Sequence, residues 1–307
     1  MAQPSHAVEQ AAEKGFNAGE TIIEHVANSS HEHPLIHLPS LFGIDMSVTK
    51  HVLMLWVVAV LVFTIVTMAV RRYLKQDRLV PSGFMTALEI GVEYVRDEIV
   101  RPNLGNKHVN GWSPLLLSIF FFILTANLIG LFPVFDALAL LNHAVLHMPE
   151  DSFLTRVTHG GITATGNFNV TAAMATVTFF AIIVAGTRAH GFVQHWKNLV
   201  PHGVPLWLYP LLVPLEVIGM FVRPFALTMR LAANMTGGHI ALMAIMSFVF
   251  IFAELYGRAV GIGIGAVFVV PLAVLISGLE MIVILVQAYV FTLLSAVFIG
   301  MAIHAHH

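Results

Sequence analysis

Residues 225–239 read FALTMRLAANMTGGH, and this stretch places Arg230, Asn234 and His239 inside a long apolar run. A run of this length and composition is typical of a helix that crosses a membrane. Arginine stays protonated at any accessible pH, so Arg230 would carry a charge into the hydrocarbon region at a high free-energy cost. Alternatively, Arg230 lies at a helix end and extends to the headgroups, but apolar residues flank it on both sides. We therefore expect Arg230 to act on a mobile charge.

The composition of the whole chain is that of a polytopic membrane protein. Of its 307 residues, 57% are hydrophobic and 10% are charged, so several apolar helices are expected rather than a soluble domain. The formal net charge is −2, which does not favour a nucleic-acid partner. The absence of cysteine excludes disulfides and cysteine-based redox chemistry, and no cofactor or metal site is expected.

The basic residues of the chain predict its orientation. Residues 1–49 form a polar, acidic segment, and residues 50–307 form a single membrane domain that begins with a span at 50–72. Arg71, Arg72 and Lys75 mark the end of that span. Because cytoplasmic loops carry an excess of lysine and arginine, this end is expected in the cytoplasm and the N-terminus outside. Five crossings would then leave the C-terminus in the cytoplasm.

Residues 81–101 form a helix of another kind. Apolar residues recur on one face and charged residues on another, so we expect the helix to lie along the cytoplasmic surface of the membrane. The apolar face consists of Phe84, Leu88, Val92, Val95 and Ile99. Two further spans, 113–135 and 170–188, enclose an outer loop at 136–169, and Asn127 is the polar residue inside the first of them.

Two apolar segments, 204–253 and 258–304, are too long for one perpendicular crossing each. At about 1.5 Å per residue each would extend roughly 65–70 Å, about twice the hydrocarbon thickness. Each segment could split into two crossings, or the two could form steeply tilted, bent helices. Splitting requires polar turns, whereas prolines kink a helix without supplying a hydrophilic loop. We therefore favour two tilted helices, which would form a hairpin.

A hairpin folded around residues 254–258 would place its polar residues in two layers. Arg230 would lie level with Gln287, and His239 level with Glu280. Glu280 and Gln287 are seven residues apart and share a helix face, as do Glu216, Arg223 and Arg230.

The polar residues thus divide into a route at Glu216 and another at His239 and Glu280, with Arg230 between them. Histidine and glutamate can exchange protons near neutral pH, so this arrangement suits ion movement in two half-steps. A buried ion pair that only fixes the register of the helices is the alternative for His239 and Glu280. Four small residues would let another helix approach closely: Ala232, Ala233, Gly237 and Gly238.

These residues resemble subunit a of F-type ATP synthases. The resemblance rests on MRLAANM at 229–235, on Gly238-His239, and on Glu280 followed by Gln287-Ala288-Tyr289. NLIGLFP at 127–133 and NFNVT at 167–171 support it, and the similarity extends over roughly residues 50–305.

The resemblance implies a non-catalytic, proton-conducting stator subunit whose Arg230 meets each carboxylate of a ring of subunit c. Asn234 and Gln287 would flank Arg230, with His239 and Glu280 on the outer half-channel and Glu216 on the cytoplasmic one. Asn127 would belong to the proton pathway, and Gly130 stands where some members have an acid. In some members the acid and the histidine also occupy the opposite positions.

The implied partners are the subunit c ring, peripheral-stalk subunit b, the rest of the ATP synthase and the lipid bilayer of a bacterial inner membrane. The alternative function is a self-contained, ion-coupled secondary transporter. Such a transporter is expected to show an internal repeat, and we find none in the sequence.

Overall fold

The computed structural model describes residues 19, 47–75, 82–131, 164–197 and 205–304. Most of the predicted N-terminal segment 1–49 and of the predicted outer loop 136–169 lies outside these residues, so both remain predictions. The described chain folds into α3 (Lys50–Leu74), α4 (Phe84–Glu93), the π-helical η1 (Tyr94–Val100), α5 (Arg101–Leu104), α6 (Val109–Leu131), η3 (Ala164–Gly166), α9 (Phe168–His190), α10 (Phe192–Lys197), η4 (Leu206–Leu208), α11 (Tyr209–Tyr256), α12 (Arg258–Ile264), the π-helical η5 (Gly265–Val269) and α13 (Val270–Ile303).

Within the described residues, five helices are long and apolar enough to cross a membrane, which confirms the expected class of an all-α polytopic membrane protein. They are α3, α6, α9, α11 and the continuous helical run Arg258–Ile303. Because lipid tails are as apolar as leucine, such helices associate through close packing and hydrogen bonds rather than through the hydrophobic effect. Both occur between α9 and α13, where the buried hydroxyls of Thr178 and Ser295 lie 3.2 Å apart.

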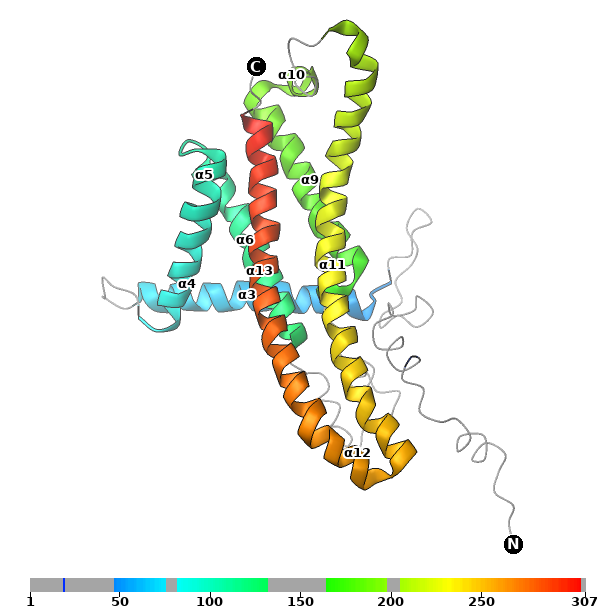
Figure 1. Cartoon of the computed structure of the whole chain (residues 1–307). Helices are drawn as coiled ribbons and strands as arrows, with labels where there is room; N and C mark the ends of the chain where they lie inside the picture. Colours follow the sequence, from blue (N-terminus) through cyan, green and yellow to red (C-terminus); the bar gives the residue numbers. More distant parts are fainter. Residues whose placement is uncertain (1–18, 20–46, 76–81, 132–163, 198–204, 305–307) are drawn as a thin grey trace.

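Each of the two long apolar segments forms one uninterrupted helical rod. α11 has 48 residues and the run from Arg258 to Ile303 has 46, so each is about 70 Å long at ~1.5 Å per residue. Pro214 and Pro224 lie inside α11 without a polar loop. The rods turn back on each other at Gly257, whose φ of 95° suits glycine, and they lie side by side in Figure 1. Two crossings per segment are therefore excluded.

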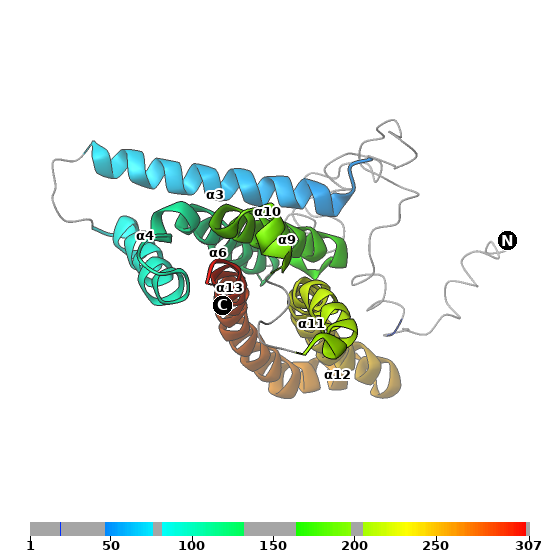
Figure 2. The same ribbon diagram turned by 90° about the horizontal axis from the view of Figure 1, so that it is seen from above.

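Helix α3 lies across the other long helices. Figures 1 and 2 show it running crosswise behind α6 and α9, on the face opposite α11 and α13. It contacts α6, α9 and α4. Its outer side exposes large apolar side chains, among them Trp56, Val60 and Phe63. An apolar surface of this kind is suited to lipid.

The predicted amphipathic helix is present as α4, η1 and α5, and it packs against α6 and α13. Leu88, Val95 and Ile99 are buried, whereas Glu93 is exposed, as the pattern predicts. Phe84 differs from the prediction, since it is 61% exposed at the first residue of α4. It lies at the helix end, one turn before the first buried residue.

The core lies between α6, α9 and α13 and fixes the arrangement of the hairpin. It is built from fully buried aliphatic and aromatic side chains, including Leu116, Ile123, Phe291 and Ile299. At the edge of the core, Gly300 of α13 lies close to the backbone carbonyl of Asn103. A Cβ at position 300 would collide with that oxygen.

We expect Gly300→Ala to destabilise the protein by about 1–3 kcal/mol, as overpacking does, because the Asn103 carbonyl belongs to the backbone and cannot rotate away. Gly278→Ala on the same helix is the matched control, since a Cβ there meets nothing within 4 Å. Thermal unfolding of the purified protein in detergent measures both changes. Equal unfolding temperatures for the two variants would contradict the proposed contact.

Candidate functional site

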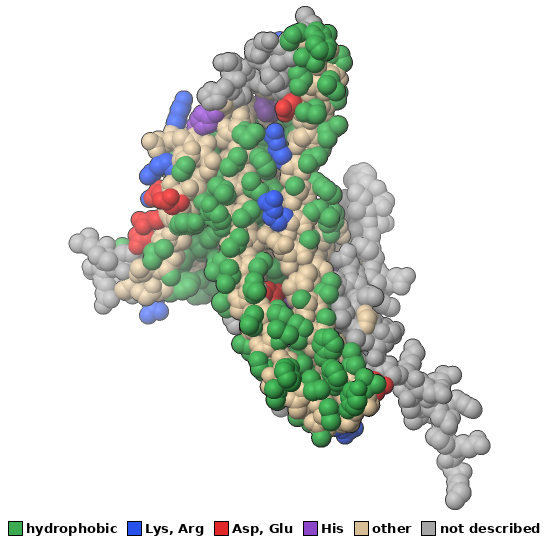
Figure 3. Space-filling view, viewed as in Figure 1, with side chains coloured by type: hydrophobic (Ala, Val, Ile, Leu, Met, Phe, Trp, Pro, Cys, Tyr) green, Lys and Arg blue, Asp and Glu red, His purple; other side chains and the backbone are tan. Residues whose placement is uncertain are grey.

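Arg230 lies near the middle of α11 on an exposed face. Its side chain makes no hydrogen bond or ion pair with any residue that the structure describes. Ala226, Ala233 and Gly237 share this face at helical spacing, and all three are exposed. A Cβ at Gly237 would meet nothing within 4 Å. In Figure 3 isolated Lys and Arg side chains lie on the otherwise apolar surface over α11 and α13.

An amide pair joins the two long helices one turn from Arg230. The Asn234 side-chain amide donates to Gln287 Oε1 at 2.9 Å, and Gln287 is buried. The predicted level pairing of Arg230 with Gln287 is therefore wrong, because Gln287 lies opposite Asn234.

The register of the hairpin changes along its length. Near the turn, Gly261 packs against Ala253 and Gly265 against Val249, at equal numbers of residues from Gly257. The π-helical η5 then follows on the returning arm. A π-helical turn contains more residues than an α-helical turn. Beyond η5, a residue of the returning arm is therefore farther from Gly257 in sequence than the α11 residue at the same level.

Glu280 is buried against the backbone of Gly238, the residue before His239. A Cβ on Gly238 would lie 2.8 Å from Glu280 Oε1, so the carboxylate occupies the space that the missing side chain leaves. Glu280 is 7% exposed, and its Oε1 has no hydrogen-bond partner among the described residues. The hairpin thus brings Glu280 to the level of half-buried His239, as expected from the sequence.

Glu216 lies toward the other end of α11 and has a cationic neighbour. Arg223 Nη2 lies 3.9 Å from Glu216 Oε2, and both side chains are about one-third exposed. The Arg223 guanidinium also stands 5.6 Å from the centroid of the Phe298 ring, so it links α11 to α13. At this exposure the ion pair contributes little to stability, at most about 1 kcal/mol.

A third polar group connects α6 to α11 through η3. Asn127 is fully buried on α6 and accepts a hydrogen bond from the Thr165 hydroxyl. Thr236 of α11 donates to the carbonyl oxygen of Gly166 at 3.3 Å. Asn127 Nδ2 is buried with no partner among the described residues. Sequence reasoning missed Thr165 and Thr236, because both lie beside ordinary apolar residues and only the fold brings them to Asn127 and α11.

The predicted site residues therefore fall into groups along α11. Asn234 with Gln287, and His239 with Glu280, lie at neighbouring levels of the hairpin. Glu216 and Arg223 lie several turns away from these pairs along α11. Arg230 lies between the two groups. Among the described residues Asn127 makes no direct hydrogen bond to these side chains, and Thr165 and Gly166 of η3 link it to α11.

Comparison with known proteins assigns this architecture to a family. The family model described as ATP synthase A chain matches residues 52–300. The chain is 36% identical over 308 residues to "ATP synthase subunit a 2" of Chlorobium luteolum, covering 98% of this chain and 80% of that protein. It is 38% identical over 265 residues to "ATP synthase subunit a" of Myxococcus xanthus, covering 86% of this chain and 75% of the relative.

A third relative, "ATP synthase subunit a" of Chloroherpeton thalassium, is 36% identical over 277 residues, covering 89% of this chain and 72% of the relative. The matched region includes α11 and α13 as far as residue 300, with Arg230, His239, Glu280 and Gln287. The chain belongs to the family of the ATP synthase A chain, also called subunit a.

Proposed function

We propose that this chain is the proton-translocating stator subunit of an F-type ATP synthase and that it couples proton flow to the rotation of a subunit c ring. The observation that carries the proposal is the exposed Arg230, which has no counter-ion among the described residues of its own chain. A charge on an apolar helix requires a partner, and a carboxylate on a neighbouring ring supplies one. Nucleotide chemistry then resides on other subunits, and this chain is not an enzyme by itself.

The surroundings of Arg230 support contact with a passing helix. The small residues Ala226, Ala233 and Gly237 do not project far from this face of α11, so another helix can approach it closely. At ~4 Å and an effective dielectric constant of about 20, opposite unit charges attract each other by about 4 kcal/mol. Arg230 therefore favours the ionised form of a ring carboxylate as it passes, and the carboxylate releases its proton.

The polar groups on either side of Arg230 form the two half-channels. We assign Asn127, His239 and Glu280 to the outer one, next to the amide pair of Asn234 and Gln287. Glu280 Oε1 and Asn127 Nδ2 are buried without a partner among the described residues, so water can bind at either atom and a proton can bind at the carboxylate. We assign Glu216 to the cytoplasmic half-channel. The fixed charge of Arg230 repels a proton that would pass directly between the two.

The orientation follows from α3 and its basic end. Arg71 and Arg72 in the last turn of α3 support a cytoplasmic location for that end and an external N-terminus. The amphipathic helix α4 lies near this end and crosswise to α3, which suits the cytoplasmic surface of a bacterial inner membrane (Figure 1). The long helices are also crosswise to α3 and so run at a steep tilt, which fits rods of about 70 Å into a bilayer. The C-terminus is then cytoplasmic.

The partners in this proposal are the subunit c ring, peripheral-stalk subunit b and the surrounding lipid. A self-contained secondary transporter is the alternative, but it would have to supply a carboxylate for Arg230 from its own chain. The described acids near the hairpin are placed elsewhere, since Glu280 packs on Gly238 and Glu216 pairs with Arg223.

We expect Arg230→Ala to abolish ATP-driven proton pumping and to permit passive proton leak, because the barrier between the half-channels is gone. Arg230→Lys should also lose coupled transport, since lysine lacks the planar guanidinium and can lose its proton when buried. Arg258→Ala, at the turn of the hairpin, is the control and should pump normally. Fluorescence quenching of a pH dye in inverted membrane vesicles measures pumping and leak; a fully assembled Arg230→Ala complex that pumps at the wild-type rate would refute the mechanism.

We expect His239 and Glu280 to act as one proton site. Replacing either residue alone should impair proton flux, because the other stays buried without its partner. The exchange variant, with His239→Glu and Glu280→His together, should recover part of the flux. Proton flux through reconstituted, assembled complexes tests this, and an exchange variant no better than the worse single variant would count against the pairing.

The orientation is tested with introduced cysteines, since the chain has none of its own. Glu89→Cys and Glu93→Cys should react with a membrane-impermeant maleimide from the cytoplasmic side. Arg258→Cys, at the hairpin turn, should react from the opposite side. Labelling of all three from one side would show that the proposed topology is wrong.

A further inference from the structure

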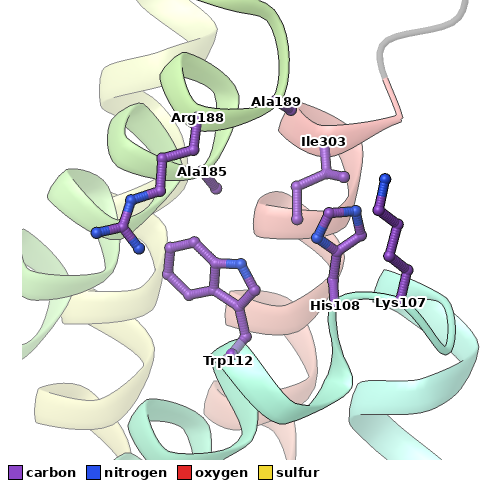
Figure 4. A pocket seen from close by; sticks show the side chains of 8 residues that line it. Lys107, His108, Trp112, Ala185, Arg188, Ala189 and Ile303 are labelled. Atoms are coloured by element: carbon purple, nitrogen blue, oxygen red, sulfur yellow. The ribbon is translucent and has the colours of Figure 1, made fainter.

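A cavity of about 200 Å³ lies away from Arg230, where the start of α6 meets the ends of α9 and α13. Figure 4 shows Trp112 and His108 in its centre, with Arg188 and Lys107 on opposite sides of them. Its remaining lining residues are small or apolar: Gly111, Ala185, Ala189 and Ile303. At ~30 Å³ per water, the cavity has room for about six water-sized groups, more than a single small ion needs.

The cavity offers positive charge and hydrogen-bond donors without matching acceptors. Neither Lys107 nor Arg188 forms an ion pair with any described residue, and the Trp112 indole N–H has no described acceptor. No aspartate or glutamate lines the cavity. Asp97, on nearby η1, is already held by Arg96 and Arg101 at 3.0 and 3.1 Å. This combination favours an anion.

The position of the cavity is that of a lipid headgroup. Arg188 lies in the last turn of α9 and Ile303 is the last residue of α13, so the cavity lies where two apolar spans end. Tryptophan and basic residues at the ends of spans are typical of the membrane interface. The neighbouring surface of α9 exposes Val177, Phe180 and Val184, which offer apolar contacts to acyl chains.

We propose that this cavity binds the phosphodiester headgroup of an anionic phospholipid. The positive charges of Lys107 and Arg188, at opposite edges of the cavity, would attract the phosphate, and the Trp112 N–H would donate to one of its oxygens. The apolar wall of Trp112, Ala185 and Ile303 distinguishes a lipid from a free phosphate ion, because only a lipid has a glycerol and acyl chains to place against it. Basic pockets between membrane helices bind anionic lipids in the same manner.

Such a lipid would join three helix ends. His190 Nε2 lies 3.0 Å from the carbonyl oxygen of Ile303, so the ends of α9 and α13 already meet beside the cavity. The ring of His108 at the start of α6 stands edge-on to His304, at 6.3 Å between centroids. A headgroup between Lys107 and Arg188 would add a link between α6 and α9.

The test is equilibrium binding of isotopically labelled phosphatidylglycerol, in detergent micelles, to the purified and delipidated ATP synthase complex. We expect the double variant Lys107→Gln, Arg188→Gln to bind roughly 25-fold more weakly, about fivefold for each cation removed. Arg72→Gln with Lys197→Gln removes the same charge from residues outside the cavity and should leave the affinity unchanged. Phosphatidylcholine should show no difference between these proteins.

Two further variants keep the proposal testable if the double glutamine variant does not assemble. Trp112→Phe should weaken binding by removing the N–H, and Lys107→Arg with Arg188→Lys should preserve it. Wild-type affinity in the double glutamine variant, or in Trp112→Phe where the double variant does not assemble, would overturn the proposal. Labelled inorganic phosphate provides the other arm: if it binds as tightly as the lipid and with the same sensitivity to these variants, the cavity is a free-anion site and the lipid assignment is wrong.

Discussion

A guanidinium on an apolar helix, with no counter-ion from its own described chain, is the constraint on which the rest of the structure depends. The acids near Arg230 are held apart from it, Glu280 by the space over Gly238 and Glu216 by Arg223. If either acid could reach Arg230, the resulting ion pair would neutralise the site. The fold thus keeps the position of the counter-ion open, which is what a site for a transient external carboxylate requires.

The length of the hairpin determines how the polar groups are distributed. A rod of about 70 Å cannot stand upright in a bilayer with a hydrocarbon core of about 30 Å. Once α11 is steeply tilted, the polar groups near Glu216 and near His239 are separated sideways as well as in depth. In the proposed function this separation is useful, because a proton entering on one side must be carried laterally by the ring before it can leave on the other.

The sequence predicted the five apolar helices, the hairpin and the meeting of Glu280 with the region of His239, because these depend on composition and on distance from the turn. It did not predict that Gln287 meets Asn234, because counting residues from the turn gives the level of a residue only to within about one helical turn. Thr165 and Thr236 were also missed. Their roles depend on how η3 packs between α6 and α11, and that contact has no periodic pattern.

The adjacent glycines Gly237 and Gly238 lie on two different faces of α11. Successive residues of an α-helix point about 100° apart, so two adjacent glycines open space in two directions. At Gly237 the space faces outward beside Arg230, and at Gly238 it faces inward and holds the Glu280 carboxylate. A side chain at the first position would keep a partner helix away from the guanidinium, whereas one at the second would push the acid out of the hairpin. The same segment of α11 therefore brings the fixed charge close to a partner and keeps the internal acid close to His239.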